Sequence, residues 1–155
     1  MLKKTVAHEY CACSGETEKM INYGLEFHHI GLAAKMPDKA LLFLKGMGYV
    51  PGDTVLDELQ NVNLIFCSHP VMPSIEIIFS TDTKGPLEAI LKNSTEMIYH
   101  ICFETQSLEK TLEEIKNDGI KMKMISAPKP AILFRNQKVS FYYILGFGIV
   151  EILER

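Results

Sequence analysis

The sequence predicts an α+β fold made of two tandem βαβββ modules, whose strands form one cupped sheet of mixed or antiparallel type. A histidine opens an apolar run at His29 and again at His100. In each copy a stretch with helical spacing follows, and a glycine, Gly48 or Gly119, stands 19 residues after the histidine. Each copy then closes on an apolar strand that carries one glutamate. Such internal self-similarity dictates architecture, so two equivalent half-modules are expected.

Length and composition limit the chain to a single core. It has 155 residues, of which 47% are hydrophobic and 23% charged, enough for one buried core but few for two unrelated domains. We expect one domain at residues 26–155, with half-modules at about 26–92 and 97–155. Residues 1–25 are expected to form an N-terminal extension. Its sparse cysteine and histidine pattern favours a flexible or partner-covering segment over a metal-binding tail.

Charge and hydropathy exclude two classes of partner. The net charge is −3 and the pI is about 5.9. The chain thus lacks the surplus of basic residues that nucleic acid binding would need. No apolar run approaches the roughly 18 to 20 residues of a membrane-spanning helix, and the start of the chain lacks the apolar core of a signal peptide. A cytoplasmic protein is expected. Cys67 and Cys102 lie in apolar runs without zinc-finger spacing, which predicts reduced structural thiols.

The first module begins with a buried strand at 25–34. A helix is predicted to begin at Pro37-Asp38 and to place one apolar face on the core. That face would hold Leu41, Leu42, Leu44 and Met47. After a turn at Pro51-Gly52-Asp53, the remaining predicted elements are strands at 54–57, 60–67 and 75–79 and a short helix at 87–92.

The second module repeats this order. Its first strand is predicted at 98–104, and Ser107 is a suitable N-cap for a helix that ends at Asn117-Asp118-Gly119. A strand at 122–125 is then interrupted by the corner Pro128-Lys129-Pro130. The last predicted strands are around 132–135, 139–144 and 149–153.

Two histidines and two glutamates at repeat-equivalent places predict a metal site: His29, Glu76, His100 and Glu151. Two imidazoles and two carboxylates suit a divalent first-row metal. Side chains alternate along a strand, so each ligand can face the concave side while its neighbours pack against helices. A lone strand histidine or glutamate usually has a simpler role, but a glutamate between aliphatic residues is costly to bury without a partner such as a cation. The joint placement of all four favours the metal.

Four segments, 27–31, 73–78, 99–104 and 149–154, resemble the vicinal-oxygen-chelate superfamily, and within it methylmalonyl-CoA epimerases and clostridial-type glyoxalase I proteins. The resemblance covers about residues 26–154. It implies paired modules cupped around one divalent metal ion per chain (Zn, Ni, Co or Mn), the four ligands just named, and a homodimer. The adjacent His28 is expected to face the opposite side of its strand.

The resemblance further implies an enzyme. A metal at a carbonyl or enolate oxygen stabilises the charge that develops when the neighbouring carbon loses a proton. Glu76 and Glu151 would flank that carbon, one taking a proton and the other returning it. This chemistry suits epimerisation of an acyl thioester or isomerisation of a thiohemiacetal by a lactoylglutathione lyase.

Substrate contacts are less sharply predicted. Gln60 begins a strand and either hydrogen-bonds a substrate oxygen or faces water, and Arg135 and Lys138 either meet an acidic group or are solvated. The same fold also serves metal-free binding or resistance proteins and metal-dependent dioxygenases, because fold does not fix function. The complete ligand set argues against a metal-free binding protein. The second acidic ligand, Glu76, argues against a dioxygenase.

Overall fold

The computed structural model describes residues 22–81 and 85–155, so residues 1–21 of the predicted extension lie outside the described part. The first module contains β1 (Glu26–Ala34), α1 (Asp38–Gly46), β2 (Val50–Asp57), β3 (Val62–Ser68) and β4 (Ser74–Ser80), and α2 (Pro86–Ile90) follows it. The second contains β5 (Glu96–Thr105), α3 (Leu108–Asn117), β6 (Met122–Pro130), the 3₁₀ turn η1 (Ile132–Phe134), β7 (Lys138–Ile144) and β8 (Gly148–Glu154). The predicted α+β class with a repeated βαβββ order is confirmed.

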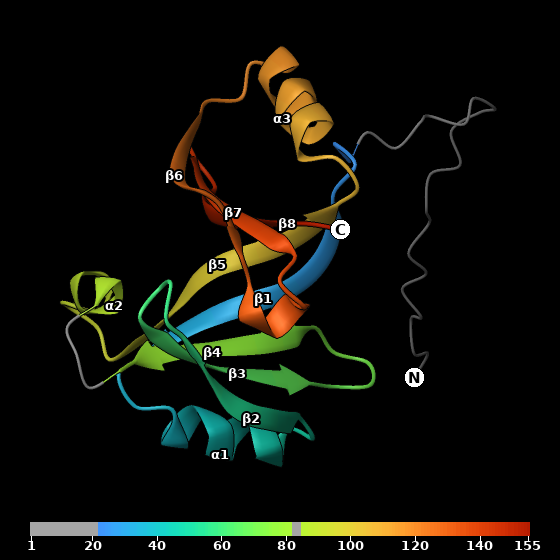
Figure 1. Ribbon diagram of the computed structural model, residues 1–155. Coiled ribbons are helices and arrows are strands. Elements are labelled where there is room, and N and C mark those ends of the chain that lie inside the picture. Colours follow the sequence, from blue (N-terminus) through green and yellow to red (C-terminus); the bar gives the residue numbers. More distant parts are fainter. Residues whose placement is uncertain (1–21, 82–84) are drawn as a thin grey trace, which may run out of the picture.

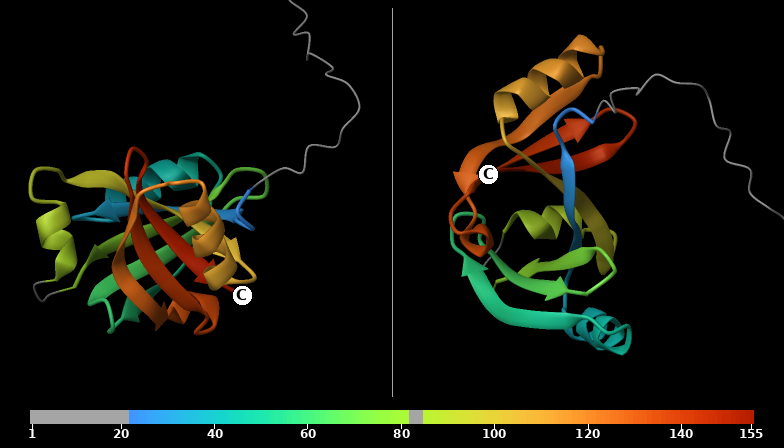
Figure 2. Two further views of the ribbon diagram at one scale, coloured as in Figure 1. Left: turned by 90° about the horizontal axis from the view of Figure 1, so that it is seen from above. Right: turned by 90° about the vertical axis from the view of Figure 1, so that its right-hand side faces the viewer.

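All eight strands form one sheet in the order β2-β3-β4-β1-β5-β8-β7-β6. The sheet is mixed: β1 pairs with β4 and β5 with β8 in parallel, whereas β1 and β5 join the two modules as an antiparallel pair. Figures 1 and 2 show that the sheet curls into a cup. No helix among the described residues is long and apolar enough to cross a bilayer.

Alternation along the strands divides the core into an outer and an inner part. On the outer face, α1 packs on side chains such as Ile65 and Ile77, and α3 packs on side chains such as Val150 and Ile152. Inside the cup, α2 closes one end through contacts with β3 and β4. The inner positions of the four central strands are thereby available for a site.

The second helix has the predicted cap. The Ser107 side chain accepts a hydrogen bond from the backbone N–H of Lys110 at 3.4 Å, which satisfies one of the unpaired donors at the start of α3. The helix ends at Asn117, next to Gly119 in a left-handed conformation (φ 73°) that favours glycine. The local sequence therefore fixes both ends of this helix.

Two predicted interruptions are absent. Strand β2 continues through the predicted turn at Pro51-Gly52-Asp53, because an irregularity in its pairing with β3 takes up the extra residues. Strand β6 runs through Pro128 and Pro130. It is the last strand of the sheet, and prolines are tolerated where one side of a strand needs no hydrogen-bonded partner.

Two other predictions are wrong. The predicted strand at 132–135 is the turn η1, which packs over the inner face through Leu133 and Phe134. On α1 the predicted apolar face included Leu42 and Met47, but these side chains are 75% and 46% exposed. Leu42 points away from Leu41 and Leu44 at 100° per residue, and Met47 lies beyond the end of the helix.

Candidate metal centre

The four predicted ligands converge inside the cup. Glu76 on β4, His29 on β1, His100 on β5 and Glu151 on β8 come from four consecutive strands at the centre of the sheet, one from each. Their exposed fractions are between 0% and 5%. Because each strand is regular around its glutamate, every acid faces inward between aliphatic neighbours that face outward.

The ring nitrogens and carboxylate oxygens of these residues face one another. The Nε2 atoms of His29 and His100 are 3.3 Å apart. Oε2 of Glu151 is 3.3 Å from each of these nitrogens, and Oε2 of Glu76 is 3.5 Å from His29 and 3.7 Å from His100. One ligand atom from each of the four residues lies within 4.8 Å of every other.

This spacing fits a bound divalent cation. Metal–ligand bonds of about 2.0 to 2.2 Å place the ligands of a tetrahedral site about 3.3 to 3.6 Å apart. The four ligand atoms define six distances, and the five given above are 3.3 to 3.7 Å. These are longer than the roughly 2.7 to 2.9 Å of a charge-assisted hydrogen bond. Among the described residues, the buried Oε2 of Glu151 has no hydrogen-bond partner. Two nitrogens and two oxygens are also a suitable donor set for a first-row divalent metal.

The charges within the group stabilise one another. Burial alone would lower the pKa of His29, but the nearby carboxylates of Glu151 and Glu76 outweigh burial and raise that pKa to about 9. Burial opposes ionisation of Glu151, yet the two histidine rings outweigh it and hold the pKa of this carboxyl well below its usual range. Without a metal, a protonated His29 therefore supplies part of the positive charge that a bound cation would supply.

Gly31 on β1 leaves the space in which the His100 ring lies. The two residues are directly opposite across the β1–β5 pair. A β-carbon at Gly31 would lie 2.5 Å from both ring nitrogens of His100 and closer still to Cε1. The sequence signal for this role is a glycine inside an apolar strand, which marks a close approach of another group.

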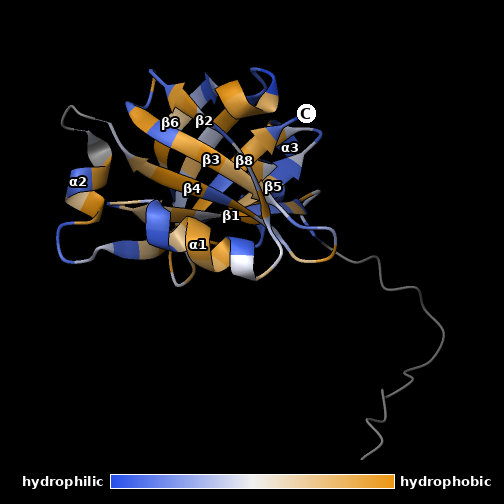
Figure 3. Ribbon diagram, turned by 90° about the horizontal axis from the view of Figure 1, so that it is seen from below, coloured by the Kyte–Doolittle hydropathy of each residue, from blue (hydrophilic) through white to orange (hydrophobic). Residues whose placement is uncertain are grey.

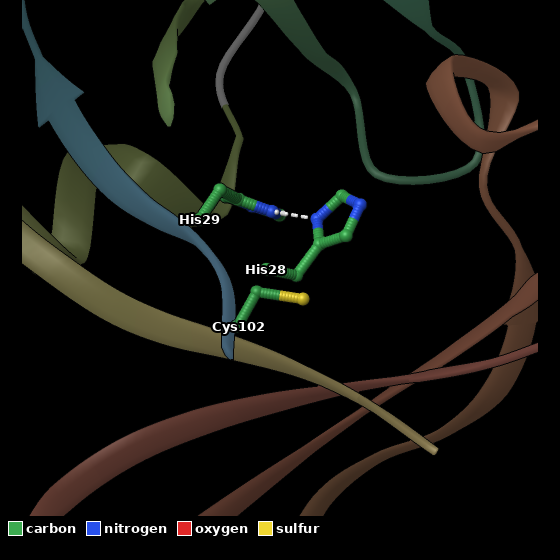
Figure 4. Close-up of side chains that lie close together, drawn as sticks. All are labelled: His28, His29 and Cys102. Atoms are coloured by element: carbon green, nitrogen blue, oxygen red, sulfur yellow. Dashed lines mark hydrogen bonds between the residues drawn. The ribbon is translucent and has the colours of Figure 1, made fainter. Parts of the chain in front are cut away.

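The prediction that His28 faces the opposite side of its strand is wrong, because its ring lies next to that of His29. Its Nδ1 atom lies 2.7 Å from Nδ1 of His29, the contact drawn as a dashed line in Figure 4. The pairing of β1 with β5 shifts register between Phe27 and His29, and such an irregularity breaks the alternation of side chains. Burial and the charge of His29 lower the pKa of His28.

Cys102 lies beside these two rings. Its Sγ could complete a group of three metal-ligating atoms with His28 and His29. Burial, followed by the charge of Glu151, raises the pKa of this thiol far above its ordinary value, which keeps it protonated. Cys67 is likewise a free, buried cysteine, so both described cysteines agree with the predicted reduced state.

A cavity of about 40 Å³ reaches Glu76, His100 and Glu151. Gln60 lines it, held by a hydrogen bond from its Nε2 to Oδ2 of Asp57 at 2.9 Å. Asp57 also accepts the backbone N–H groups of Leu59 and Gln60, which fixes this turn. The sequence had singled out Gln60 but not Asp57.

Arg135 and Lys138 are not part of this cavity. Both side chains are exposed, and neither lines it. Most of the lining is apolar or aromatic and comes from the following side chains: Val62, Leu64, Ile78, Leu87, Ile90, Tyr99, Leu133, Phe134 and Phe141. An outer hollow of about 400 Å³ adjoins the cavity and shares Asp57 and Ile132 with it. The small inner cavity and the wider hollow therefore lie next to each other.

The chain combines a curled mixed sheet from two βαβββ modules with a buried cluster of two histidines and two glutamates, one from each central strand, that could hold one metal ion. The chain belongs to the Glyoxalase/Bleomycin resistance protein/Dioxygenase superfamily, whose family model matches residues 28–141. No curated protein matches the sequence.

Solved structures of low sequence identity share the fold. A hypothetical protein from Bacillus halodurans is 21% identical with a TM-score of 0.68, covering 84% of this chain and 94% of its own. Methylmalonyl-CoA epimerase from Mycobacterium tuberculosis is 16% identical with a TM-score of 0.66, covering 84% and 87%. A methylmalonyl-CoA epimerase in complex with methylmalonyl-CoA and NH4+ is 16% identical with a TM-score of 0.64, covering 84% and 94%. At these identities the likeness concerns the fold alone.

Proposed function

We propose that this protein is a divalent-metal-dependent enzyme that moves a proton at a carbon next to a carbonyl group. The observation that carries this proposal is the convergence of two carboxylates and two imidazoles, each pair drawn from both modules, at the inner end of an apolar cavity. Carboxylates on opposite sides of a cavity can act as general base and general acid on the same carbon. The superfamily includes enzymes of this type.

His29, Glu76, His100 and Glu151 would hold the ion, which is Zn, Ni, Co or Mn in this proposal. When bound, the ion supplies a Lewis acid that stabilises negative charge on the substrate oxygen. Glu151 lies beside both histidine rings, and as a carboxylate it would accept the proton in this proposal. Glu76 comes from the other module and would return the proton in this proposal.

The remaining cavity residues orient the substrate and exclude water. Gln60, whose Nε2 donates to Asp57, lines the cavity and would hydrogen-bond a substrate oxygen in this proposal. The apolar rings of Phe134 and Phe141 keep the site dry, which strengthens electrostatic interactions inside it. Arg135 and Lys138 remain candidates only for distant charged groups of a substrate, because they lie outside the cavity.

The size of the cavity supports a small reacting group with a larger tail. About 40 Å³ next to the ligands admits only the reacting end, whereas the outer hollow of about 400 Å³ is open to the rest. An acyl thioester has this shape, and a similarly folded protein is a methylmalonyl-CoA epimerase with methylmalonyl-CoA bound. We therefore favour epimerisation of an acyl thioester over the thiohemiacetal isomerisation of a glyoxalase-type lyase.

Hydrogen exchange in deuterated water tests the reaction. The zinc-, nickel-, cobalt- or manganese-loaded protein is incubated with methylmalonyl-CoA, and in parallel with methylglyoxal plus glutathione. Deuterium at the carbon next to the thioester, detected by mass spectrometry, is the expected result. Lactoylglutathione formation would favour the lyase, and no reaction with either would contradict both. Failure to bind any stoichiometric divalent metal would instead support a metal-free binding protein.

The variant Glu151→Gln tests the base. The amide is nearly the same size but cannot accept the proton, so we expect turnover to fall about 100-fold or more while the thermal unfolding midpoint changes little. Glu154→Gln, on the same strand but partly exposed and outside the cavity lining, is the matched control. Unchanged exchange by Glu151→Gln at equal metal content would remove Glu151 from the catalytic residues.

We also propose that the protein is a homodimer. Three apolar side chains of α1 and the preceding turn, Met36, Leu42 and Phe43, are 67% to 75% exposed. Figure 3 shows hydrophobic residues along part of the α1 ribbon. A hollow of about 660 Å³ next to Phe43 adds to this surface. Light scattering after gel filtration should give twice the chain mass of 17.5 kDa, and Phe43→Asp should shift it to the monomer. A monomeric wild type would contradict the proposal.

A further inference from the structure

The hydrogen bond between His28 and His29 is the strongest feature that the proposed reaction does not use. Both rings present Nδ1, and the two atoms are 2.7 Å apart. One proton lies between the two Nδ1 atoms of this hydrogen bond, so one ring donates and the other accepts. Which member donates decides what the opposite side of the His29 ring can bind.

The opposite side of that ring faces the ligands. Nε2 of His29 is 3.3 Å from Nε2 of His100 and 3.3 Å from Oε2 of Glu151. A histidine binds a metal only through an unprotonated nitrogen, and the hydrogen bond of its other nitrogen fixes which one that is. If Nδ1 of His29 carries the proton, Nε2 is left free for the ion.

We infer that His28 is a positioning residue, whose unprotonated Nδ1 accepts the Nδ1–H of His29 and so presents Nε2 of His29 to the metal. This inference rests on the proposed metal site. The irregular register before His29 turns the His28 side chain inward, where its ring packs edge-on against Phe134 with centroids 5.0 Å apart. A half-buried, aromatic setting favours a fixed hydrogen bond over exchange with water.

The alternative role for His28 is as a ligand of a second ion together with His29 and Cys102. A separation of 2.7 Å between the two nitrogens is a hydrogen-bond distance, shorter than the roughly 3.3 Å between nitrogens that share a tetrahedral metal. The Cys102 thiol donates to the carbonyl of Phe103 at 3.6 Å, and Figure 4 shows it beside the dashed bond. The geometry therefore favours a positioning role.

Nuclear magnetic resonance of ¹⁵N-histidine-labelled protein tests the proton position directly, because two-bond correlations identify the protonated nitrogen of each ring. In both metal-free and zinc-loaded protein, we expect a proton on Nδ1 of His29 and none on Nδ1 of His28. A proton on Nδ1 of His28 would overturn the inference. This readout does not depend on metal binding, so it still decides the matter if the wild type binds no zinc and the proposed metal site fails.

Zinc affinity, measured by competition with a chelator, tests the consequence. His28→Phe keeps a ring but removes the acceptor, and we expect a 10- to 100-fold loss, the usual effect of removing such a partner. His28→Asn keeps an acceptor oxygen near the same place and should bind zinc almost as wild type does. Equal affinity of His28→Phe and wild type, or equal losses in both variants, would contradict the role. If His28→Phe fails to unfold cooperatively, His28→Leu replaces it.

Discussion

The two modules hold their histidines by different means. His29 forms a hydrogen bond with the preceding residue, His28, at a pairing irregularity. His100 has a buried Nδ1 without a partner among the described residues, and its ring instead lies against Gly31. With the repeat offset of 71 residues, the position of His28 corresponds to Tyr99, an aromatic neighbour of His100 that lacks an imidazole acceptor. The two modules therefore share the candidate ligands but not the groups that surround them.

The largest expected effect comes from removing either imidazole. His29→Ala and His100→Ala should each lose stoichiometric zinc. We expect the zinc affinity of each variant to fall more than about a hundredfold, because loss of a metal ligand costs more than loss of a residue that orients a ligand. Zinc content after gel filtration measures this. His69→Ala is the control, since His69 only accepts backbone N–H groups at 2.9 and 3.1 Å outside the site. Zinc retained by either ligand variant would remove that histidine from the proposed site.

A smaller loss is expected from Gly31→Ala, which should act on one module only. The new methyl group would overlap the His100 ring, and such overpacking typically costs about 1 to 3 kcal/mol. We expect zinc affinity to fall about 10- to 100-fold and the His100 resonances to shift, while the His28–His29 hydrogen bond remains. Gly46→Ala is matched, because a β-carbon there would meet nothing within 4 Å. Equal zinc affinity of the two glycine variants would contradict the packing role of Gly31.

The smallest expected effect, about tenfold for each pH unit, is a pH dependence that originates at His29. In the metal-free protein this ring stays protonated up to a pKa of about 9, and it must lose a proton to bind a metal. Zinc affinity should therefore rise about tenfold per pH unit between pH 7 and 9. The raised pKa stabilises the metal-free protein fully below its ordinary value of 6.5, and this contribution is lost as pH rises through 9. Calorimetric titration at three pH values measures the proton release, and a flat profile would contradict it.

The sequence predicted the parts of the site that lie on regular strands. Glu76 and Glu151 face inward because alternation holds along β4 and β8. His100 reaches the same interior beside a second register shift of the β1–β5 pair. The rule failed at His28, because an irregular register depends on the partner strand and leaves no mark in the local sequence. The inward packing of Phe134 was missed for a related reason, since three residues of η1 are too few to distinguish a strand from a turn.

The four ligands lie on consecutive strands, and this arrangement links ion binding to the shape of the whole sheet. Neighbouring strands are about 4.8 Å apart, so β4 and β8 would be about 14 Å apart across a flat sheet. The ligand atoms of Glu76 and Glu151 nevertheless lie within 4.8 Å of each other. The curvature of the sheet and the length of the two glutamate side chains together bring these ligand atoms close to each other. An ion at the centre would resist flattening, and any substrate or partner that opens the cup would loosen all four bonds together.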